Sequence, residues 1–324
     1  MTKVKICGIT NLEDALLSAK FGADALGFNF YEKSPRYILP EKAREIIEQL
    51  PASILKVGVF VNESLQNIIE IAEIAKLDAL QLHGEEMPEF AKELRAKIGL
   101  EIIKAFRVSP SFALEGVLKY EVDAILLDAY NPKEYGGTGE TFDWEIAKKV
   151  QEIFPKMYLA GGLSNDNIVN ALQQLHPFAI DSCSCLEKEK GKKDKINLIN
   201  FITKVNHFDW WFKIKNQDDF KFSDIYEVFD LIHLRPAMYI GWKSISHLSG
   251  FLSGMNFGYH LSDVLVKYPF QFSSELSLFI QIRYGSLPYR SILEECNNDE
   301  ERAFDLFFAL LEEFKLEKED LAKD

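Results

Sequence analysis

Short apolar runs alternate with longer segments of helical spacing over the first 205 residues of the chain. The runs expected to form strands are residues 4–7, 25–28, 55–61, 79–82, 101–105, 124–128, 156–160 and 178–181. The helices expected after them are 12–21, 40–49, 63–75, 87–97, 110–119, 143–153, 165–175 and 194–205. Strands rich in valine, isoleucine and leucine that are each followed by a helix predict a parallel sheet buried on both faces.

Eight such units within about 205 residues predict a closed sheet. The fold class expected for residues 1–205 is therefore α/β, a (β/α)8 TIM barrel. An open, doubly wound sheet is the alternative. It usually has fewer strands, and no G-x-G-x-x-G sequence follows the first run here.

The pattern changes after residue 205, and no further β/α unit follows. Residues 206–324 carry 23 aromatic side chains against 18 in the longer first part. We expect these residues to form a second, smaller, mainly α-helical domain, with a linker or surface turn at 213–219. One apolar stripe at helical spacing is assigned to its core and consists of Phe304, Phe307, Phe308, Leu311 and Phe314.

Acidic side chains occupy the rest of that predicted helix, namely Glu300, Glu301, Asp305, Glu312 and Glu313. Such a series is usually a solvated helix face. The alternative is a docking surface for a basic protein partner, because complementary charge speeds encounter and adds specificity.

The bulk composition narrows the class of protein. A formal net charge of −13 argues against a nucleic-acid-binding protein, which needs a basic face. No apolar stretch is long enough to span a membrane, and the N-terminus has no signal-peptide core, so we expect a cytoplasmic protein. Cys183 and Cys185 form a C-x-C pair without a second pair at zinc-ligand spacing, so the cysteines are expected to be free thiols.

Polar residues gather where the predicted strands end, which is the functional rim of such a barrel. Cys7 ends the first strand. It is either a reactive thiol, serving as a base or a nucleophile, or a small apolar residue of the barrel core. Asp128 ends a wholly apolar run as either a partly desolvated acid or a cap for the next segment.

The remaining candidates on this rim would bind substrate. Arg36 could hold a carboxylate through its planar fork, and Gln81 and His83 end the fourth strand, where a histidine is also commonly structural. Loops after the seventh and eighth strands usually hold phosphate, and glycines let the backbone N–H groups approach it. The expected phosphate residues are Gly161, Gly162, Ser182, Cys183 and Ser184.

Several ordered motifs resemble one enzyme family. The motifs are KICGIT at 5–10, GFNFYEKSPRYI at 27–38, VGVFVN at 57–62, QLHGEE at 81–86, LLDAY with YGGTGETFDW within 126–144, and LAGGLSNDNI at 159–168. In this order and spacing they resemble phosphoribosylanthranilate isomerase of tryptophan biosynthesis over essentially all of residues 1–205.

The resemblance implies a reaction and roles for named residues. The reaction is the Amadori rearrangement of N-(5′-phosphoribosyl)anthranilate to 1-(2-carboxyphenylamino)-1-deoxyribulose 5-phosphate, without cofactor or metal. By resemblance, Cys7 is the general base that removes the proton from C2′, and Asp128 is the general acid that protonates the ring oxygen. Arg36 would hold the anthranilate carboxylate, and the substrate phosphate would lie against Gly161, Gly162 and the loop after the eighth strand.

One stretch departs from the family pattern. After the eighth strand the family usually reads Asp-Val-Ser-Ser-Gly-Val-Glu, whereas this chain reads Asp-Ser-Cys-Ser-Cys-Leu-Glu at 181–187. If Cys185 stands at positive φ in place of the glycine, it costs about 1 kcal/mol or more. We therefore expect an active enzyme with a raised KM.

The second domain offers weaker motifs. RPAMYIG at 235–241 resembles a string in gyrase-type ATPase domains, but the acidic helix motif and glycine-rich lid that follow it there are absent. The wider pattern over 220–316 resembles small bacterial proteins of unassigned or immunity type. Three hypotheses remain for the chain: an isomerase with an appended interaction domain, a barrel that serves as a binding scaffold, or a fusion of unrelated reading frames. In the third, the C-terminal part retains a binding function like that of a toxin-immunity protein.

Overall fold

The computed structural model describes residues 1–109, 112–129, 144–214, 225–234, 236, 240, 243–251, 271–284 and 288–321. The chain divides into two compact units, Met1–Asn206 and His207–Asp324. Most of the YGGTGETFDW motif and most of the 235–241 string lie outside the described residues, as does part of the helix expected at 110–119.

The first unit is a closed barrel of eight parallel strands, which confirms the predicted fold class. Its strands are β1 (Lys3–Cys7), β2 (Ala25–Asn29), β3 (Leu55–Phe60), β4 (Ala79–Leu82), β5 (Glu101–Val108), β6 (Ala124–Ala129), β7 (Met157–Leu159) and β8 (Ala179–Ser182). They pair in sequence order, and β8 closes the barrel against β1.

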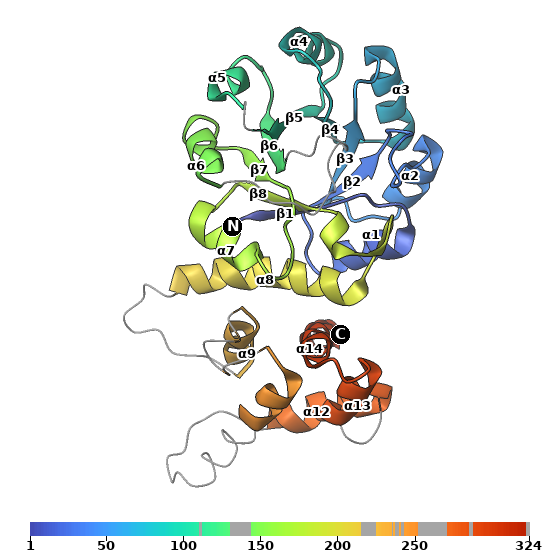
Figure 1. Ribbon diagram of the computed structural model, residues 1–324. Coiled ribbons are helices and arrows are strands. Elements are labelled where there is room, and N and C mark those ends of the chain that lie inside the picture. Colours follow the sequence, from blue (N-terminus) through green and yellow to red (C-terminus); the bar gives the residue numbers. More distant parts are fainter. Residues whose placement is uncertain are drawn as a thin grey trace. The chain divides into compact units, whose positions relative to one another are not determined.

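Helices lie on the outside of the barrel (Figure 1). They are α1 (Leu12–Lys20), α2 (Pro40–Ile47), α3 (Leu65–Ala75), α4 (Pro88–Lys97), α5 (Leu114–Val117), α6 (Trp144–Ile153) and α7 (Ile168–Leu175). Local sequence sets their starts: the Asn11 side chain accepts from the Asp14 N–H at 2.9 Å, and α2 and α4 begin at prolines.

Alternate strand residues face the inside of the barrel, because successive side chains point to opposite faces of a sheet. The interior is filled by small and branched apolar residues such as Ala25, Val57, Ala79 and Leu126. The same alternation therefore carries polar residues onto the inner face at the carboxyl ends of the strands.

A short hairpin follows β8, and sequence reasoning did not predict it. It begins with a 3-10 turn, η1 (Ser184–Leu186), and continues as the antiparallel strands β9 (Glu187–Glu189) and β10 (Lys192–Lys193). Gly191 has a φ of +80°, which suits glycine in the tight turn between the two strands. Helix α8 (Lys195–Ile214) comes next and runs nine residues past the expected end at 205, through the start of the segment expected to be a linker.

The described part of the second unit is helical: α9 (Ile225–Leu234), α12 (Gln271–Tyr284), α13 (Pro288–Glu295) and α14 (Glu300–Leu321). The predicted aromatic stripe of α14 is buried. Phe307 lies 5.8 Å from both Phe229 of α9 and Tyr289 of α13, and Phe314 lies 5.3 Å from Phe279 of α12, as ring centroids. Helix α14 is thus packed against the other three.

The acidic face expected on α14 is partly internal, so the prediction that it is solvated was wrong for two of its five residues. Asp305 and Glu312 are buried. Lys243 Nζ lies 2.9 Å from an Asp305 oxygen, and Lys315 Nζ lies 2.9 Å from a Glu312 oxygen. Glu300 is half-buried and accepts from the hydroxyl groups of two serines. These carboxylates stabilise the unit from within.

Among the described residues, no helix is both long and apolar enough to cross a membrane.

Candidate active site

A cavity of about 620 Å³ opens at the carboxyl ends of the barrel strands. All ten of the predicted site residues line it, and they come from six of the eight strands or from the loops that follow them. Strand alternation explains the convergence: Gln81 and Asp128 are in phase with inward-facing residues of their own strands, and Cys7 pairs with Gly27, which is in phase with the inward-facing Ala25.

A buried ion pair lies directly below Cys7 in the barrel. Lys5, two residues earlier on β1, is fully buried, and its Nζ donates to an Asp181 oxygen on β8 at 2.9 Å. Burial acts to lower the pKa of Lys5, but Asp181 and Cys7 raise it above its ordinary value, so Lys5 is a cation. Its positive charge in turn favours the thiolate form of Cys7.

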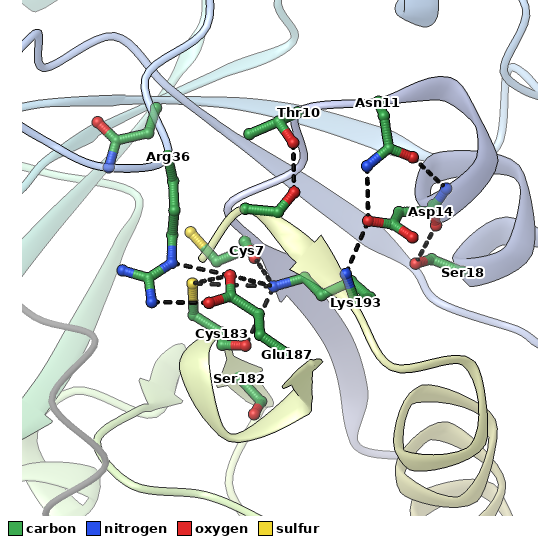
Figure 2. A network of polar contacts seen from close by, with 12 residues as sticks. Cys7, Thr10, Asn11, Asp14, Ser18, Arg36, Ser182, Cys183, Glu187 and Lys193 are labelled. Carbon is green, nitrogen blue, oxygen red and sulfur yellow. Dashed lines mark hydrogen bonds and ion pairs between the residues drawn. The ribbon is translucent and has the colours of Figure 1, made fainter. Parts of the chain in front are cut away.

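The thiol groups of Cys7 and Cys183 are hydrogen-bonded to each other, and Figure 2 shows both sulfurs at the centre of the polar network. This contact, together with burial, raises the pKa of Cys7 well above its ordinary value. The same hydrogen bond lowers the pKa of Cys183 to about 7, where Lys193 and Arg36 add to the effect while burial and Glu187 oppose it. Near neutral pH the two thiols therefore hold one proton between them.

Asp128 is in contact with His83 on the same inner face. His83 Nε2 lies 3.3 Å from Asp128 Oδ2, and both side chains are buried. On the other side of the imidazole ring, Gln81 Nε2 lies 2.7 Å from Nδ1. An amide N–H donated to Nδ1 leaves the ring proton on Nε2, facing the carboxyl group. Gln81 and His83 thus orient the candidate acid.

Arg36 is held by an acidic residue from the hairpin after β8. Its Nε and Nη2 atoms donate to the two carboxylate oxygens of Glu187, each at 2.8 Å (Figure 2). Lys193 lies 3.3 Å from the same carboxylate and is itself buried. The guanidinium group is thereby fixed at the cavity wall, with its Nη1 side not used by Glu187.

The glycine pair after β7 has the backbone geometry expected of an anion cradle. Gly161 and Gly162 have φ values of +87° and +62°, which favour glycine. The Ser182 hydroxyl donates to the carbonyl oxygen of Leu163 at 2.7 Å, so it joins the loop after β7 to the end of β8. Ser184 begins the 3-10 turn beside them.

Cys185 does not stand at positive φ; it lies inside the 3-10 turn. The expected backbone strain at this position was therefore wrong. Its half-buried side chain lines the cavity, so any effect on phosphate binding would come from the side chain and not from a strained backbone.

Sequence reasoning did not assign roles to Lys5, Glu187 and Lys193. A usable signal existed for Lys5, because a lysine in phase with Cys7 on a buried strand must point into the barrel. Glu187 and Lys193 lie in a short, highly charged hairpin with no apolar pattern, so nothing in the sequence pointed to them.

An eight-stranded parallel barrel with titratable side chains and a glycine cradle at the carboxyl ends of its strands is typical of a (β/α)8-barrel enzyme that acts on a phosphorylated substrate. The family profile described as N-(5'phosphoribosyl)anthranilate (PRA) isomerase matches residues 4–204. The chain belongs to this isomerase family.

Individual relatives agree. N-(5'-phosphoribosyl)anthranilate isomerase of Pelobacter propionicus is 49% identical over 202 residues, which are 62% of this chain and 94% of the relative. The crystal structure of phosphoribosyl anthranilate isomerase from Thermotoga maritima has 45% identity and a TM-score of 0.60, covering 64% of this chain and 99% of that one. A second structure, 43% identical with a TM-score of 0.56, is a complex with reduced 1-(o-carboxyphenylamino)-1-deoxyribulose 5-phosphate. It covers 63% of this chain and 97% of its own.

Proposed function

We propose that the first unit catalyses the isomerisation of N-(5′-phosphoribosyl)anthranilate to 1-(2-carboxyphenylamino)-1-deoxyribulose 5-phosphate, a step of tryptophan biosynthesis. One observation carries the assignment of residues: Cys7 and Asp128 line the same cavity, together with a glycine pair suited to phosphate. A rearrangement of this kind needs an acid and a base that both reach one small sugar.

The residues divide the reaction into two proton transfers. Asp128 gives a proton to the ring oxygen as the C1′–O bond breaks and the substrate nitrogen forms a C=N bond. The thiolate of Cys7 then removes the proton from C2′, and the electrons of that C–H bond form the C1′–C2′ double bond of an enol amine. Return of a proton to C1′ gives the ketone product. Cys7 reaches this form by passing its proton to the Cys183 thiolate. The charge of Lys5 favours it against the Cys183 hydrogen bond and burial, which raise the pKa of Cys7.

Two anchors place the sugar between acid and base. Arg36, held by Glu187, offers the Nη1 side of its guanidinium group to the anthranilate carboxylate. The backbone of Gly161 and Gly162, with the loop after β8, takes the phosphate. Anchors at the two ends of the substrate fix C2′ relative to the base.

The test is turnover by the full-length chain, followed as loss of the fluorescence of the anthranilate derivative at saturating substrate. We expect activity in the wild-type protein and in Cys296→Ser, which changes a thiol of the second unit, and a strong loss in Cys7→Ser. No consumption by the wild-type protein would refute the function. Full activity in Cys7→Ser would refute only the assigned base.

For the second unit, the prediction of a basic protein partner rests on its charge, with 20 acidic and 12 basic residues in 206–324. Because Asp305 and Glu312 are buried, the exposed carboxylates Glu301, Glu317 and Glu319 are the better docking candidates. A basic protein that is recovered at low salt with the full chain, but not with the variant that combines Glu301→Lys, Glu317→Lys and Glu319→Lys, would support this role. Equal recovery with both would refute it.

A further inference from the structure

Cys7 ends β1, and Cys183 directly follows the last residue of the neighbouring strand, β8. The register between β1 and β8 pairs Lys5 with Asp181 and Ile6 with Ser182, and one further step brings Cys7 alongside Cys183. Neighbouring strands lie about 4.8 Å apart. That spacing falls within the range of roughly 4.4–6.8 Å between the Cα atoms of disulfide-linked cysteines.

The backbone around the two cysteines is held together by a buried cation. Lys193 Nζ donates to the carbonyl oxygen of Cys7 at 2.7 Å and to that of Cys183 at 3.0 Å. Gly8 adds a close approach: a Cβ atom there would lie 2.8 Å from the Cys183 sulfur. The two thiols are hydrogen-bonded to each other inside this frame, so the sulfurs are already in contact.

The two sulfurs differ in their surroundings. Cys183 Sγ lies 3.9 Å from Lys193 Nζ, with Arg36 also close enough to stabilise negative charge, while Glu187 Oε1 at 3.9 Å opposes it. The hydrogen bond with Cys7, together with the charges of Lys193 and Arg36, lowers the pKa of Cys183 to about 7 against burial and Glu187. The pKa of Cys7 is instead raised above its ordinary value. A thiolate is the form that attacks peroxides, so Cys183 is the attacking thiol and Cys7 the second one.

We propose that Cys7 and Cys183 form a reversible peroxide-sensitive dithiol, and that their disulfide switches the isomerase off. The Cys183 thiolate attacks hydrogen peroxide, the O–O bond breaks, and a sulfenic acid and hydroxide form. The Cys7 sulfur then displaces oxygen from Cys183, and the S–S bond forms as water leaves. In total, two thiols and one peroxide give one disulfide and two waters, and a reducing dithiol reverses the change.

The effect on activity rests on the proposed role of Cys7 as the base, whereas the modification itself does not. Both cysteines line the open cavity of about 620 Å³, so a small oxidant has a path to them. A bound substrate analogue would cover the same cavity. Occupancy of the site is therefore expected to protect the pair from oxidation.

The experiment treats the reduced full-length protein with hydrogen peroxide, blocks the remaining thiols, and maps the cysteine peptides by mass spectrometry. We expect a cross-linked Cys7–Cys183 peptide with the loss of two hydrogen atoms, a parallel loss of activity, and recovery of both after addition of dithiothreitol. Each variant is compared with its own reduced sample, so a change in basal activity does not confuse the result.

The controls separate the alternatives. Cys183→Ser should form no cross-link. Its inactivation by peroxide at pH 7 should be slower than that of the wild-type protein by a factor of about ten or more, because an ordinary thiol has only a few per cent thiolate at this pH. Cys296→Ser and Cys185→Ser should keep the cross-link. A Cys183–Cys185 disulfide, or oxidation of Cys183 to a sulfinic acid without a cross-link, would overturn the proposal. The peptide map of the wild-type protein decides this even if the chain shows no isomerase activity.

Discussion

The carboxylate of Glu187 accepts two parallel hydrogen bonds of 2.8 Å from the guanidinium group of Arg36, although the two residues are 151 positions apart in the chain. The pair is almost completely buried at the wall of the cavity. Glu187 thus fixes the plane of the guanidinium group, and we propose that its remaining N–H groups bind the substrate carboxylate. These two hydrogen bonds give Glu187 a positioning role, because they orient the Arg36 side chain.

Replacing Arg36 with lysine should therefore weaken substrate binding. A lysine ammonium would pair with Glu187 and leave no planar fork for the anthranilate carboxylate. We expect Arg36→Lys to raise KM by about 10- to 100-fold, the equivalent of roughly 1.5–3 kcal/mol for hydrogen bonds to a charged group, with a smaller effect on kcat. Arg44→Lys, which changes an exposed arginine, is the matched control in steady-state assays. An unchanged KM would exclude Arg36 as the carboxylate anchor.

Asp128→Asn tests the proposed acid. The amide is nearly the same size and can keep contact with His83, but it cannot give up a proton at neutral pH. The expected result is a fall of about 10²- to 10⁴-fold in kcat with little change in KM. Asp320→Asn, an exposed carboxylate of α14, should leave both constants unchanged. A fall of less than tenfold in kcat would mean that another group protonates the ring oxygen.

The shared proton of Cys7 and Cys183 should appear in the pH dependence of the reaction. Because the pKa of Cys183 is lowered to about 7, the pair gains its first negative charge near neutral pH, and that charge can reside on Cys7 through the hydrogen bond. kcat/KM should then rise as pH increases through about 7. In Cys183→Ala only Cys7 is left to titrate, and burial raises its pKa by more than Lys5 lowers it, so the rise should move to higher pH.

This pH profile distinguishes proton sharing from a packing role. A variant that only loosens the cavity would lower kcat/KM at every pH and leave the midpoint of the rise in place. Cys183→Ser keeps a hydroxyl donor and should fall between the wild-type protein and Cys183→Ala. Identical midpoints in all three proteins would show that Cys7 titrates independently of Cys183.

The glycine cradle and Cys185 should respond differently to alanine. Gly161 has a φ of +87°, where an added Cβ costs about 1 kcal/mol or more, so Gly161→Ala should shift the loop and raise KM severalfold. Cys185 lies in a 3-10 turn that any residue can adopt, so Cys185→Ala should change KM little. Substrate titration of both variants, with inorganic phosphate as a competing ligand, makes the comparison. A larger effect at Cys185 would point to direct phosphate contact by its side chain.

Two regularities explain why so much of the site could be predicted: side chains alternate along a strand, and the functional residues of such a barrel lie at the carboxyl ends of its strands. Cys7, Gln81 and Asp128 end apolar strands in the inward phase, so the sequence alone places them at one mouth of the barrel. Glu187 and Lys193 follow a different logic. They occupy two- and three-residue strands whose position depends on the hairpin turn and on partners far away in the chain.

The error on α14 has a similar cause. Helical periodicity separates an apolar stripe from a polar face, but it cannot reveal that Lys243 reaches Asp305 from another segment. A charged residue is treated as solvated until its partner is known. The burial of Asp305 was therefore invisible in the pattern of its own helix, whereas the burial of Phe304 was not.

The ion pair of Lys5 with Asp181 should make a large contribution that is lost when one partner is removed. Asp181→Ala leaves a fully buried ammonium group without its carboxylate, and we expect the free energy of unfolding to fall by about 3–5 kcal/mol. Urea unfolding followed by circular dichroism measures the change. Glu45→Ala, which breaks an exposed pair with Lys42, should cost less than about 1 kcal/mol.

A double replacement separates the worth of the pair from the cost of breaking it. Lys5→Met combined with Asp181→Leu removes both charges and fills the space with apolar atoms, so the protein should recover most of the stability lost in Asp181→Ala. Activity should not recover with it, because the positive charge that favours the Cys7 thiolate is gone. If stability and activity both recovered, Lys5 would have only a structural role in the barrel. The thiolate of Cys7 would then depend on Cys183 and its neighbours alone.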